Sequence, residues 1–363
     1  MKVSILSMQR VYNYGSFLQA YGLKKILESS GHQVNFIDIL PGENQESDGK
    51  PGTSVFDKIK TLLSLNAVKH IIFKLKTNEL ENLFVKWQGE ELGITEEKML
   101  LASDCDAVVI GSDEVFNCSS SCWWGVSTQL YGDIPCSKVI SYAASCGFFT
   151  YEDLPEKYRG DVKRALEHQS AVSVRDDNTF DFVKKVSGIE ASYNLDPVLM
   201  YNFDDEVERV EKQMDLNEDY MIIYAYRNRI SDKSEIKAIK DYARKHKLRL
   251  YCVGGSLSWC DKFPLWTPFQ VLAGFKNAAC VVTDTFHGTI MAAKYNRPFV
   301  SLVRESNANK LNDLLRRLDL MEHKWDGKSP IEGKMEISDF GGFNAVVDRE
   351  RKNTADYFEK NLA

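Results

Sequence analysis

The chain has 363 residues, more than one hydrophobic core normally holds, so two domains are expected. Its 44% hydrophobic and 27% charged residues supply material for packed cores and exclude long disorder. The net charge of -6 gives no overall attraction for nucleic acid, so any anionic ligand has to be met by a local site.

The chain begins with a pattern typical of a βαβ unit. Its predicted elements are the strand Lys2–Ser7, the helix Ser16–Ser29 and the strand Gln33–Ile39. A right-handed crossover places the loop between the first strand and the helix at the C-terminal edge of a parallel sheet. Ligands bind at that edge, so Asn13, Tyr14 and Gly15 are candidate binding residues.

Residues 54–98 are expected to form a helical insertion. Between Lys58 and Lys76 this segment is cationic and amphipathic, because lysines accompany Leu, Ile and Phe without an acidic residue. The pattern fits a surface that touches anionic lipid head groups, but it is more typical of helices that cover a sheet with lysines in water. Peripheral contact with the inner face of the plasma membrane is therefore a hypothesis.

Two turns of small residues follow predicted strands further along the chain. Gly111, Ser112 and Asp113 follow the strand Ala107–Ile110, and Ala143 follows the strand Lys138–Tyr142. Small residues let the backbone approach a ligand closely, so both turns are candidate binding segments.

Arg175 directly follows a predicted buried strand, Ala171–Val174, between predicted helices at Glu156–His168 and Asn178–Val186. Its guanidinium is expected at the ligand edge, where its planar fork matches phosphate or carboxylate. The alternative is a structural ion pair with one of the two aspartates that follow it, Asp176 and Asp177.

The second half repeats the alternation of strands and helices after the acidic segment Tyr201–Asp219. The predicted elements are the strands Tyr220–Tyr226, Leu248–Val253, Cys280–Thr283 and Phe299–Val303 and the helices Asp232–His246, Pro268–Asn277, His287–Tyr295 and Lys310–Leu318. The predicted domains are therefore residues 1–199 and 200–335. A tail of residues 336–363 follows, whose helix Asp348–Asn361 could cross back to the first domain.

The Asp284–Gly288 turn lies between a predicted strand and a predicted helix. The backbone N–H groups of Gly288 and Thr289 are expected to be unpaired at the helix N-terminus and to attract phosphate or carboxylate. His287 could then transfer a proton to a bound ligand. The alternative is that the Asp or Thr of this turn only caps the helix and that His287 hydrogen-bonds internally.

Two further segments are candidate anion sites. Asn309 and Lys310 begin a predicted helix after a strand, so the Lys310 ammonium either reaches an anion or remains solvated. Gly254 and Gly255 resemble part of a nucleotide-binding loop. The third glycine of the dinucleotide motif and the Gly-Lys-Ser/Thr of a P-loop are missing.

The cysteines and histidines indicate a reducing compartment and a reaction without metal. None of the eight cysteines forms a Cys-x-x-Cys pair, and the six histidines show no close pair on one helical face. The first apolar run is too brief for a signal peptide, and no stretch reaches the ~18 residues of a membrane span. A cytoplasmic protein is expected.

Several stretches of the chain together resemble the polysaccharide pyruvyl transferase family. They are Asn13–Gly15 with Leu18–Tyr21, Gly111–Asn117, Ser141–Ser145, Ser173–Arg175, Asp196–Pro197 and Thr283–Gly288. The resemblance runs in order to about Leu320, and Asn307–Leu315 fits the family's late helix motif.

The resemblance implies a GT-B-like fold, in which two doubly wound Rossmann-type domains face a cleft. It also implies transfer of the enolpyruvyl unit of phosphoenolpyruvate onto two hydroxyls of a sugar, giving a pyruvate ketal and phosphate. The acceptor would belong to a bacterial cell-surface polysaccharide, such as exopolysaccharide or capsule, or to its lipid-linked precursor. Phosphoenolpyruvate is the donor substrate, and no cofactor or metal is implied.

Two other functions remain open at this point. A GT-B glycosyltransferase would place a nucleotide sugar at Gly254, Gly255 and the start of the His287 helix. A non-catalytic carbohydrate-binding relative would bind sugar without turnover. The sequence defines neither the linkage of the acceptor, which could be nucleotide, lipid or polymer, nor the oligomeric state.

The resemblance also assigns roles to residues. His287 would act as general acid or base, Arg175 and Lys310 would offset the charge of the donor, and Asp284 would orient His287. Characterised pyruvyl transferases have Arg-Leu-His where this chain has Thr285, Phe286 and His287. The predicted substrate-binding residues are Asn13, Tyr14, Gly15, Gly111, Ser112, Asp113, Ala143, Gly254, Gly255, Thr285, Phe286, Gly288, Asn309 and Lys310.

Overall fold

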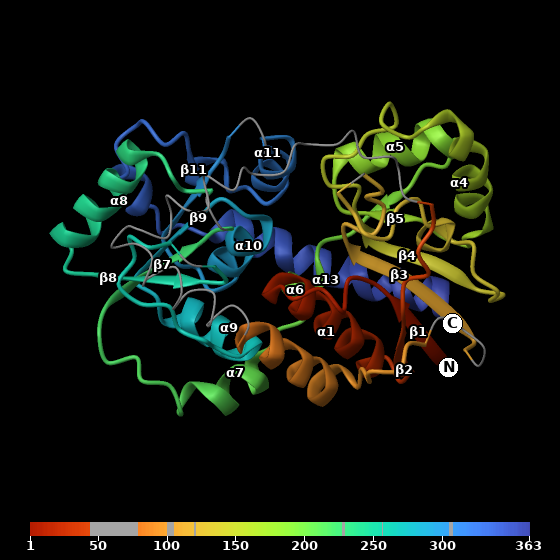
Figure 1. Ribbon diagram of the computed structural model, residues 1–363, viewed down its shortest axis with the longest axis horizontal. Helices are drawn as coiled ribbons and strands as arrows, with labels where there is room; N and C mark the ends of the chain where they lie inside the picture. The colour runs from red at the N-terminus through yellow and green to blue at the C-terminus, as the bar shows by residue number, and fades with distance from the viewer. Residues whose placement is uncertain (44–78, 100–104, 120, 227–228, 256, 305–307) are drawn as a thin grey trace, which may run out of the picture.

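A computed structural model describes most of the chain (Figure 1). The described residues are 1–43, 79–99, 105–119, 121–226, 229–255, 257–304 and 308–363. Most of the predicted insertion, including Lys58–Lys76, lies outside the described residues. Residues 79–87 are helical and continue into the π-helical turn η1 (Gln88–Leu92). Among the described residues, no helix is both long and apolar enough to cross a membrane.

The first half of the chain forms a parallel sheet in the order β2-β1-β3-β4-β5-β6. Its strands are β1 (Lys2–Leu6), β2 (Gln33–Ile37), β3 (Ala107–Asp113), β4 (Val139–Ala144), β5 (Ser173–Val174) and β6 (Ser192–Tyr193). The elements that accompany them are α1 (Tyr14–Ser29), η2 (Thr128–Tyr131), α4 (Glu156–His168), α5 (Asp177–Ser187) and α6 (Pro197–Met200). Every residue of β3 and β4 is buried, as is typical of a parallel sheet covered on both faces.

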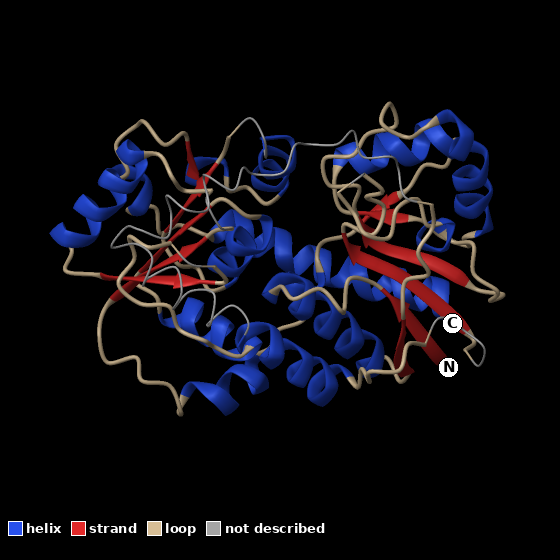
Figure 2. Ribbon diagram, in the orientation of Figure 1, coloured by secondary structure: helices blue, strands red, loops and turns tan. Residues whose placement is uncertain are grey.

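The second half forms a parallel sheet in the order β11-β10-β9-β7-β8. Its strands are β7 (Tyr220–Tyr224), β8 (Arg249–Val253), β9 (Cys280–Thr283), β10 (Phe299–Leu302) and β11 (Lys324–Trp325). The helical elements are α7 (Asp204–Glu211), α8 (Lys233–Lys245), α9 (Pro268–Asn277), α10 (Phe286–Lys294), α11 (Ala308–Arg317), η4 (Met321–His323) and α12 (Glu332–Met335). The prediction of two doubly wound α/β domains is thus confirmed, and Figure 2 shows the two sheets apart, with helices around each.

Both sheets reverse their strand order at one point. In the first sheet β1 lies between β2 and β3, and in the second β7 lies between β8 and β9. The connections on the two sides of such a switch point run to opposite faces, so a crevice opens at the carboxyl ends of the strands. The loops after β1, β3, β7 and β9 are therefore the expected ligand-binding loops.

Helix α13 (Gly341–Leu362) connects the two halves. Near its start, Phe343 contacts Phe340, whose ring lies 5.1 Å from that of His323 in the second half. Near its end, the Tyr357 hydroxyl donates to the Ser141 carbonyl on β4 at 2.6 Å. Figure 1 shows α13 spanning the region between the two sheets. It begins before the predicted Asp348, because two glycines of low helix propensity obscure its first turn.

Candidate functional site

A cavity of about 370 Å³ lies between the two halves, at the ends of the switch-point strands. Its walls come from the loops after β1, β3, β4, β7 and β9 and from the starts of α1, α10 and α11. The lining residues are Met8, Val11, Asn13, Ser16, Asp113, Glu114, Trp124 and Phe148 from the first half, and Tyr226, Arg229, Asp284, Thr285, Phe286, His287, Ala308, Lys310 and Leu311 from the second.

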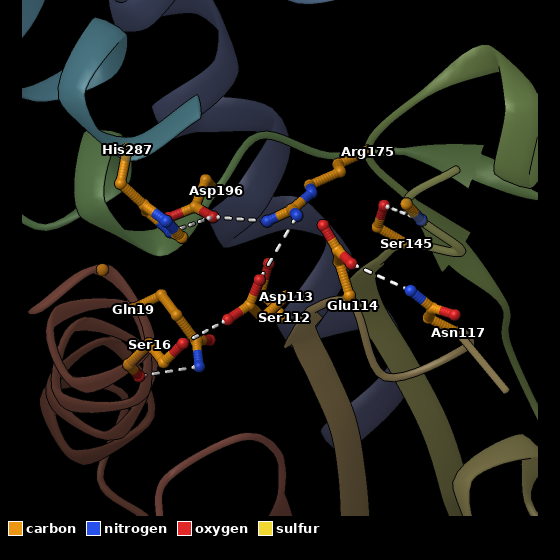
Figure 3. A network of polar contacts seen from close by, with 12 residues as sticks. Ser16, Gln19, Ser112, Asp113, Glu114, Asn117, Ser145, Arg175, Asp196 and His287 are labelled. Carbon is orange, nitrogen blue, oxygen red and sulfur yellow. Dashed lines mark hydrogen bonds and ion pairs between the residues drawn. The ribbon is translucent and has the colours of Figure 1, made fainter. Parts of the chain in front are cut away.

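His287 lies in the first turn of α10 and is 7% exposed. Thr285 is the N-cap of this helix, and its side chain accepts the Gly288 N–H at 3.0 Å. The ring of His287 points across to the first half, where its Nε2 lies 3.5 Å from Asp196 Oδ2 (Figure 3). This separation allows an ion pair but exceeds that of a well-formed hydrogen bond.

Asp196 is positioned by the start of the short helix α6. Its Oδ1 accepts the Val198 N–H at 3.0 Å, and Pro197 occupies the first helical position, where no N–H is required. Its Oδ2 accepts Arg175 Nη1 at 2.9 Å. Burial by itself would raise the pKa of the Asp196 carboxyl, but His287 and Arg175 hold that pKa below its usual value. Asp196 is therefore a buried carboxylate poised against His287.

Arg175 joins two buried carboxylates. Its Nη2 lies 3.4 Å from Asp113 Oδ1, opposite its bond to Asp196. The guanidinium also stacks 4.2 Å from the centre of the Phe286 ring, and its side chain is 1% exposed. Asp176 instead caps α5 by accepting the Thr179 N–H, and Asp177 pairs with Arg316 and Arg317. Arg175 thus holds the network together, and it is not among the described residues that line the cavity.

Asp113 and Ser16 extend this network to helix α1. The Ser16 hydroxyl donates to Asp113 Oδ2 at 2.7 Å. Burial favours a raised pKa for Asp113, but Arg175, followed by His287 and Lys310, keeps its pKa below the usual value. The network places an ionised carboxylate on the cavity wall.

Two cations line the cavity from the second half. Lys310 Nζ lies 2.5 Å from Glu114 Oε1 and 5.3 Å from the centre of the Phe286 ring. Lys310 is also the main reason that the pKa of Glu114 lies below its usual value. Arg229 is 38% exposed, and its Nη1 lies 3.9 Å from Asp284 Oδ2. Both cations can meet an anionic ligand, since neither side chain is fully enclosed.

Asp284 directly follows β9 and is 1% exposed. Burial raises the pKa of its carboxyl to about 6, against the lowering effects of Arg229 and Arg304. The sequence interpretation gave Asp284 the task of orienting His287. In the structure Asp196, from the other half of the chain, presents a carboxylate oxygen 3.5 Å from His287 Nε2.

The predicted anion site at the start of α10 is wrong in one respect. The Gly288 N–H donates to the Thr285 side chain, and the Thr289 N–H donates to the Thr285 carbonyl at 3.2 Å. The Gly288 N–H is therefore used by the helix cap, as the structural alternative anticipated, and the Thr289 N–H makes a hydrogen bond within the helix.

Seven predicted site residues line the cavity: Asn13, Asp113, Asp284, Thr285, Phe286, His287 and Lys310. The predicted residues outside its described lining are Tyr14, Gly15, Gly111, Ser112, Ala143, Arg175, Gly254, Gly255 and Gly288. Asn309 belongs to α11, but its side chain lies outside what the structure describes.

Several of these outlying residues support the lining. The Gly15 N–H donates to the side chain of the lining residue Asn13 at 2.7 Å, and Asn13 thereby caps α1. Gly111, with φ of 120°, passes so close to the Tyr142 carbonyl that a Cβ atom would lie 2.3 Å from its oxygen. Gly254 is packed against the Tyr224 ring, with which its Cβ atom would be in contact at 3.0 Å. These glycines are needed for close packing beneath the site.

Sequence reasoning assigned no role to Asp196, Ser16, Glu114, Tyr226 or Arg229. A weak signal existed for Asp196, because Asp followed by Pro is typical of a helix N-terminus. Nothing local indicated its contact with His287, since the two residues come from different domains. Among the described residues no group of three or more His, Cys, Asp or Glu side chains could hold a metal ion.

The architecture and the cavity define a two-domain GT-B protein. UDP-N-acetylglucosamine 2-epimerase from Rickettsia bellii is similar in fold at 11% identity, with 99% of this chain and 98% of that chain covered and a TM-score of 0.53. UDP-GlcNAc 2-epimerase from Methanocaldococcus jannaschii is 12% identical, with 98% of this chain and 99% of that chain covered and a TM-score of 0.49. The glycosyltransferase SnogD from Streptomyces nogalater is 11% identical, with 99% of each chain covered and a TM-score of 0.45.

A sequence model of the polysaccharide pyruvyl transferase family matches residues 13–306, which is most of the chain. The chain therefore belongs to the polysaccharide pyruvyl transferase family, as the sequence motifs predicted. No match is found among curated protein sequences.

Proposed function

We propose that this chain transfers the pyruvyl group of phosphoenolpyruvate onto two hydroxyls of a sugar, forming a ketal and releasing phosphate. The sugar belongs to a bacterial cell-surface polysaccharide or its precursor. One observation carries the proposal beyond family membership: His287, in contact with Asp196, lies on a cavity wall that also presents Lys310 and Arg229. Proton transfer and anion binding are the two tasks that this chemistry requires.

The reaction needs two additions at C2 of the donor. In the first, a proton is added to the C3 methylene, and a sugar oxygen bonds to C2 as its hydroxyl loses a proton. In the second, the bond between C2 and the phosphate oxygen breaks, the second sugar oxygen bonds to C2, and its proton leaves with the phosphate. We assign the C3 protonation to His287, which regains a proton from the first hydroxyl.

We assign this transfer to Nδ1 of the ring. His287 Nε2 is buried and faces Asp196, whereas Nδ1 lies beside Gly15 at the start of α1. The Asp196 carboxylate offers a counter-charge at 3.5 Å to the imidazolium that exists before each transfer. Such a carboxylate also fixes the orientation of the ring.

The donor carries a carboxylate and a phosphate, and its charge is assigned to Lys310 and Arg229. Arg175 is excluded from direct contact because it is buried between Asp113 and Asp196. Thr285, at the position of a family arginine, contributes a helix cap rather than a charge. Lys310 would exchange its contact with Glu114 for the ligand or share it. The proposed reaction uses neither a metal nor a further cofactor.

Thermal-shift measurements with phosphoenolpyruvate and with nucleotide sugars test the donor, since a ligand that binds only the native state raises the melting temperature. We expect phosphoenolpyruvate to stabilise the protein and Lys310→Gln to weaken that effect. The glycosyltransferase alternative needs Gly254 and Gly255 at a nucleotide, yet both lie outside the described cavity lining. Stabilisation by nucleotide sugars alone would overturn the proposed donor.

A further inference from the structure

Four aromatic side chains among the described residues are highly exposed, and three of them line the cavity or contact its lining. They are Tyr12, Trp123, Phe148 and Tyr226, which are 50%, 54%, 65% and 46% exposed. Phe148 and Tyr226 line the cavity, and Trp123 contacts the lining residue Trp124 with 5.6 Å between ring centres. The Tyr12 ring stacks instead on Phe84, with 6.2 Å between ring centres. Grouped exposed apolar surface of this kind marks an interaction site.

Two of the aromatic segments are held in place by hydrogen bonds. The Asn178 amide donates to the carbonyls of Gly147 and Phe149 at 3.1 and 2.9 Å, which fixes the turn that carries Phe148. The Trp124 indole N–H donates to the Asn117 carbonyl at 2.8 Å. The rings are therefore presented by ordered turns, and a ligand that stacks on them has little ordering cost to meet.

The surroundings of these rings favour a carbohydrate over a purely apolar partner. The same cavity presents the carboxylates of Asp113 and Glu114 and the cations Lys310 and Arg229. A hydrocarbon chain would leave these groups desolvated without partners. A sugar has an apolar face of C–H groups that packs on an aromatic ring and a rim of hydroxyls that hydrogen-bonds to charged groups.

We propose that Trp123, Trp124 and Phe148 form a platform, here the aromatic rim, on which the glycosyl units next to the modified sugar stack. The aromatic rim belongs to the first half of the chain, whereas the two cations assigned to the donor belong to the second. The acceptor is accordingly an oligosaccharide or longer glycan rather than a single sugar. That this glycan is the acceptor rests on the proposed function. That the aromatic rim binds a glycan does not depend on the proposed function.

Calorimetric titration of neutral oligosaccharides of one to four units, chosen from a glycan array as binders, tests the rim. We expect the wild-type affinity to increase with chain length. Phe148→Ala and Trp123→Ala should weaken binding of the longer ligands roughly tenfold, the loss typical of removing an exposed aromatic anchor. Phe148→Tyr should retain the affinity. The matched control is Met321→Ala, which removes a 45% exposed side chain outside the cavity lining and should change nothing.

Failure of the rim can be distinguished from failure of the proposed function. Equal glycan affinity in wild type and Phe148→Ala, or no binder in the array, overturns the rim even when phosphoenolpyruvate is turned over. Loss of glycan binding in Phe148→Ala, without any phosphate release by the wild type, supports the rim and overturns the donor. Phosphoenolpyruvate-induced thermal shifts should be the same in all four variants.

Discussion

Gly15 lies directly against the imidazole of His287. A Cβ atom at Gly15 would be 2.1 Å from His287 Nδ1, far inside van der Waals contact. The first residue belongs to helix α1 of the first half and the second to helix α10 of the second. The absence of a side chain at Gly15 therefore allows the His287 ring to take this position. The nitrogen that faces Gly15 is Nδ1, to which we assign the proton transfer.

Gly15→Ala should move the His287 ring and lower kcat by roughly a hundredfold, because catalysis is sensitive to displacements of about 1 Å. Steady-state kinetics, with circular dichroism to confirm folding, measures this effect. Gly160→Ala is the matched control. Gly160 lies inside helix α4 with Arg164 Nη1 3.7 Å from its added Cβ atom, so the variant should keep full activity. Its helix should gain about 0.5 to 1 kcal/mol of stability. A fully active Gly15→Ala enzyme would contradict the positioning role.

Asp196→Asn should impair both catalysis and stability. The amide has no charge to balance Arg175 or a protonated His287, which lie 2.9 and 3.5 Å from Oδ2. Removing one partner of a buried ion pair typically costs about 3 to 5 kcal/mol of unfolding free energy. Urea denaturation and kcat measurements provide the two readouts.

Asp177→Asn offers the comparison for that variant. Asp177 pairs with Arg316 at 2.6 Å and with Arg317, and its own side chain is 50% exposed. Exposed ion pairs contribute about 1 kcal/mol or less, so this variant should remain close to wild type in stability and activity. Equal behaviour of the two variants would contradict the account of a buried network around Asp196.

Asp284→Asn should change how stability depends on pH. The pKa of Asp284 is about 6 in the folded chain and 3.8 ordinarily, so the folded state binds this proton more tightly than the unfolded state. The contribution of Asp284 to the free energy of unfolding of the wild type therefore falls as pH rises through 6. The fall is about 1 kcal/mol between pH 5 and pH 7.5. The asparagine variant should lack that decline. Urea denaturation of both proteins at several pH values provides the comparison, and parallel curves would show that Asp284 titrates normally.

Thr285→Ala should destabilise the protein by about 1 kcal/mol, because the Gly288 N–H loses the acceptor that caps α10. Thr285→Ser keeps the hydroxyl and should remain within a few tenths of a kcal/mol of wild type. Thermal denaturation followed by circular dichroism is suitable. A larger loss in the serine variant than in the alanine variant would argue against the capping role.

The fold was largely predictable because its long elements carry strong periodic patterns. Helices α4 and α9 have the predicted bounds, and β9 does too. The missed elements include β6 and β11 with two residues each, α6 and α12 with four, and α7 with eight. A segment of two to four residues cannot display a period of 3.6 residues, and its structure depends on neighbours elsewhere in the chain. Helix α7 was hidden by its acidic composition, which was interpreted as a segment between domains.

The site was predictable only where a residue follows a strand. His287, Asp113 and Lys310 come after β9, within the end of β3 and after β10, and all three line the cavity. The pairing of Arg175 was not predictable, because its carboxylates come from β3 and from the loop before α6. Electrostatic partners are selected by tertiary contact, so the alternative of an ion pair with Asp176 or Asp177 named the wrong carboxylates.

The central claim is that His287 transfers a proton to phosphoenolpyruvate. Its most direct measurement is phosphate release from phosphoenolpyruvate with the acceptor glycan present, by wild type and by His287→Ala. We expect release that is stoichiometric with ketal formation in the wild type and abolished in the variant, with folding and glycan binding retained. Phosphate release by His287→Ala at a rate near that of the wild type would contradict the claim.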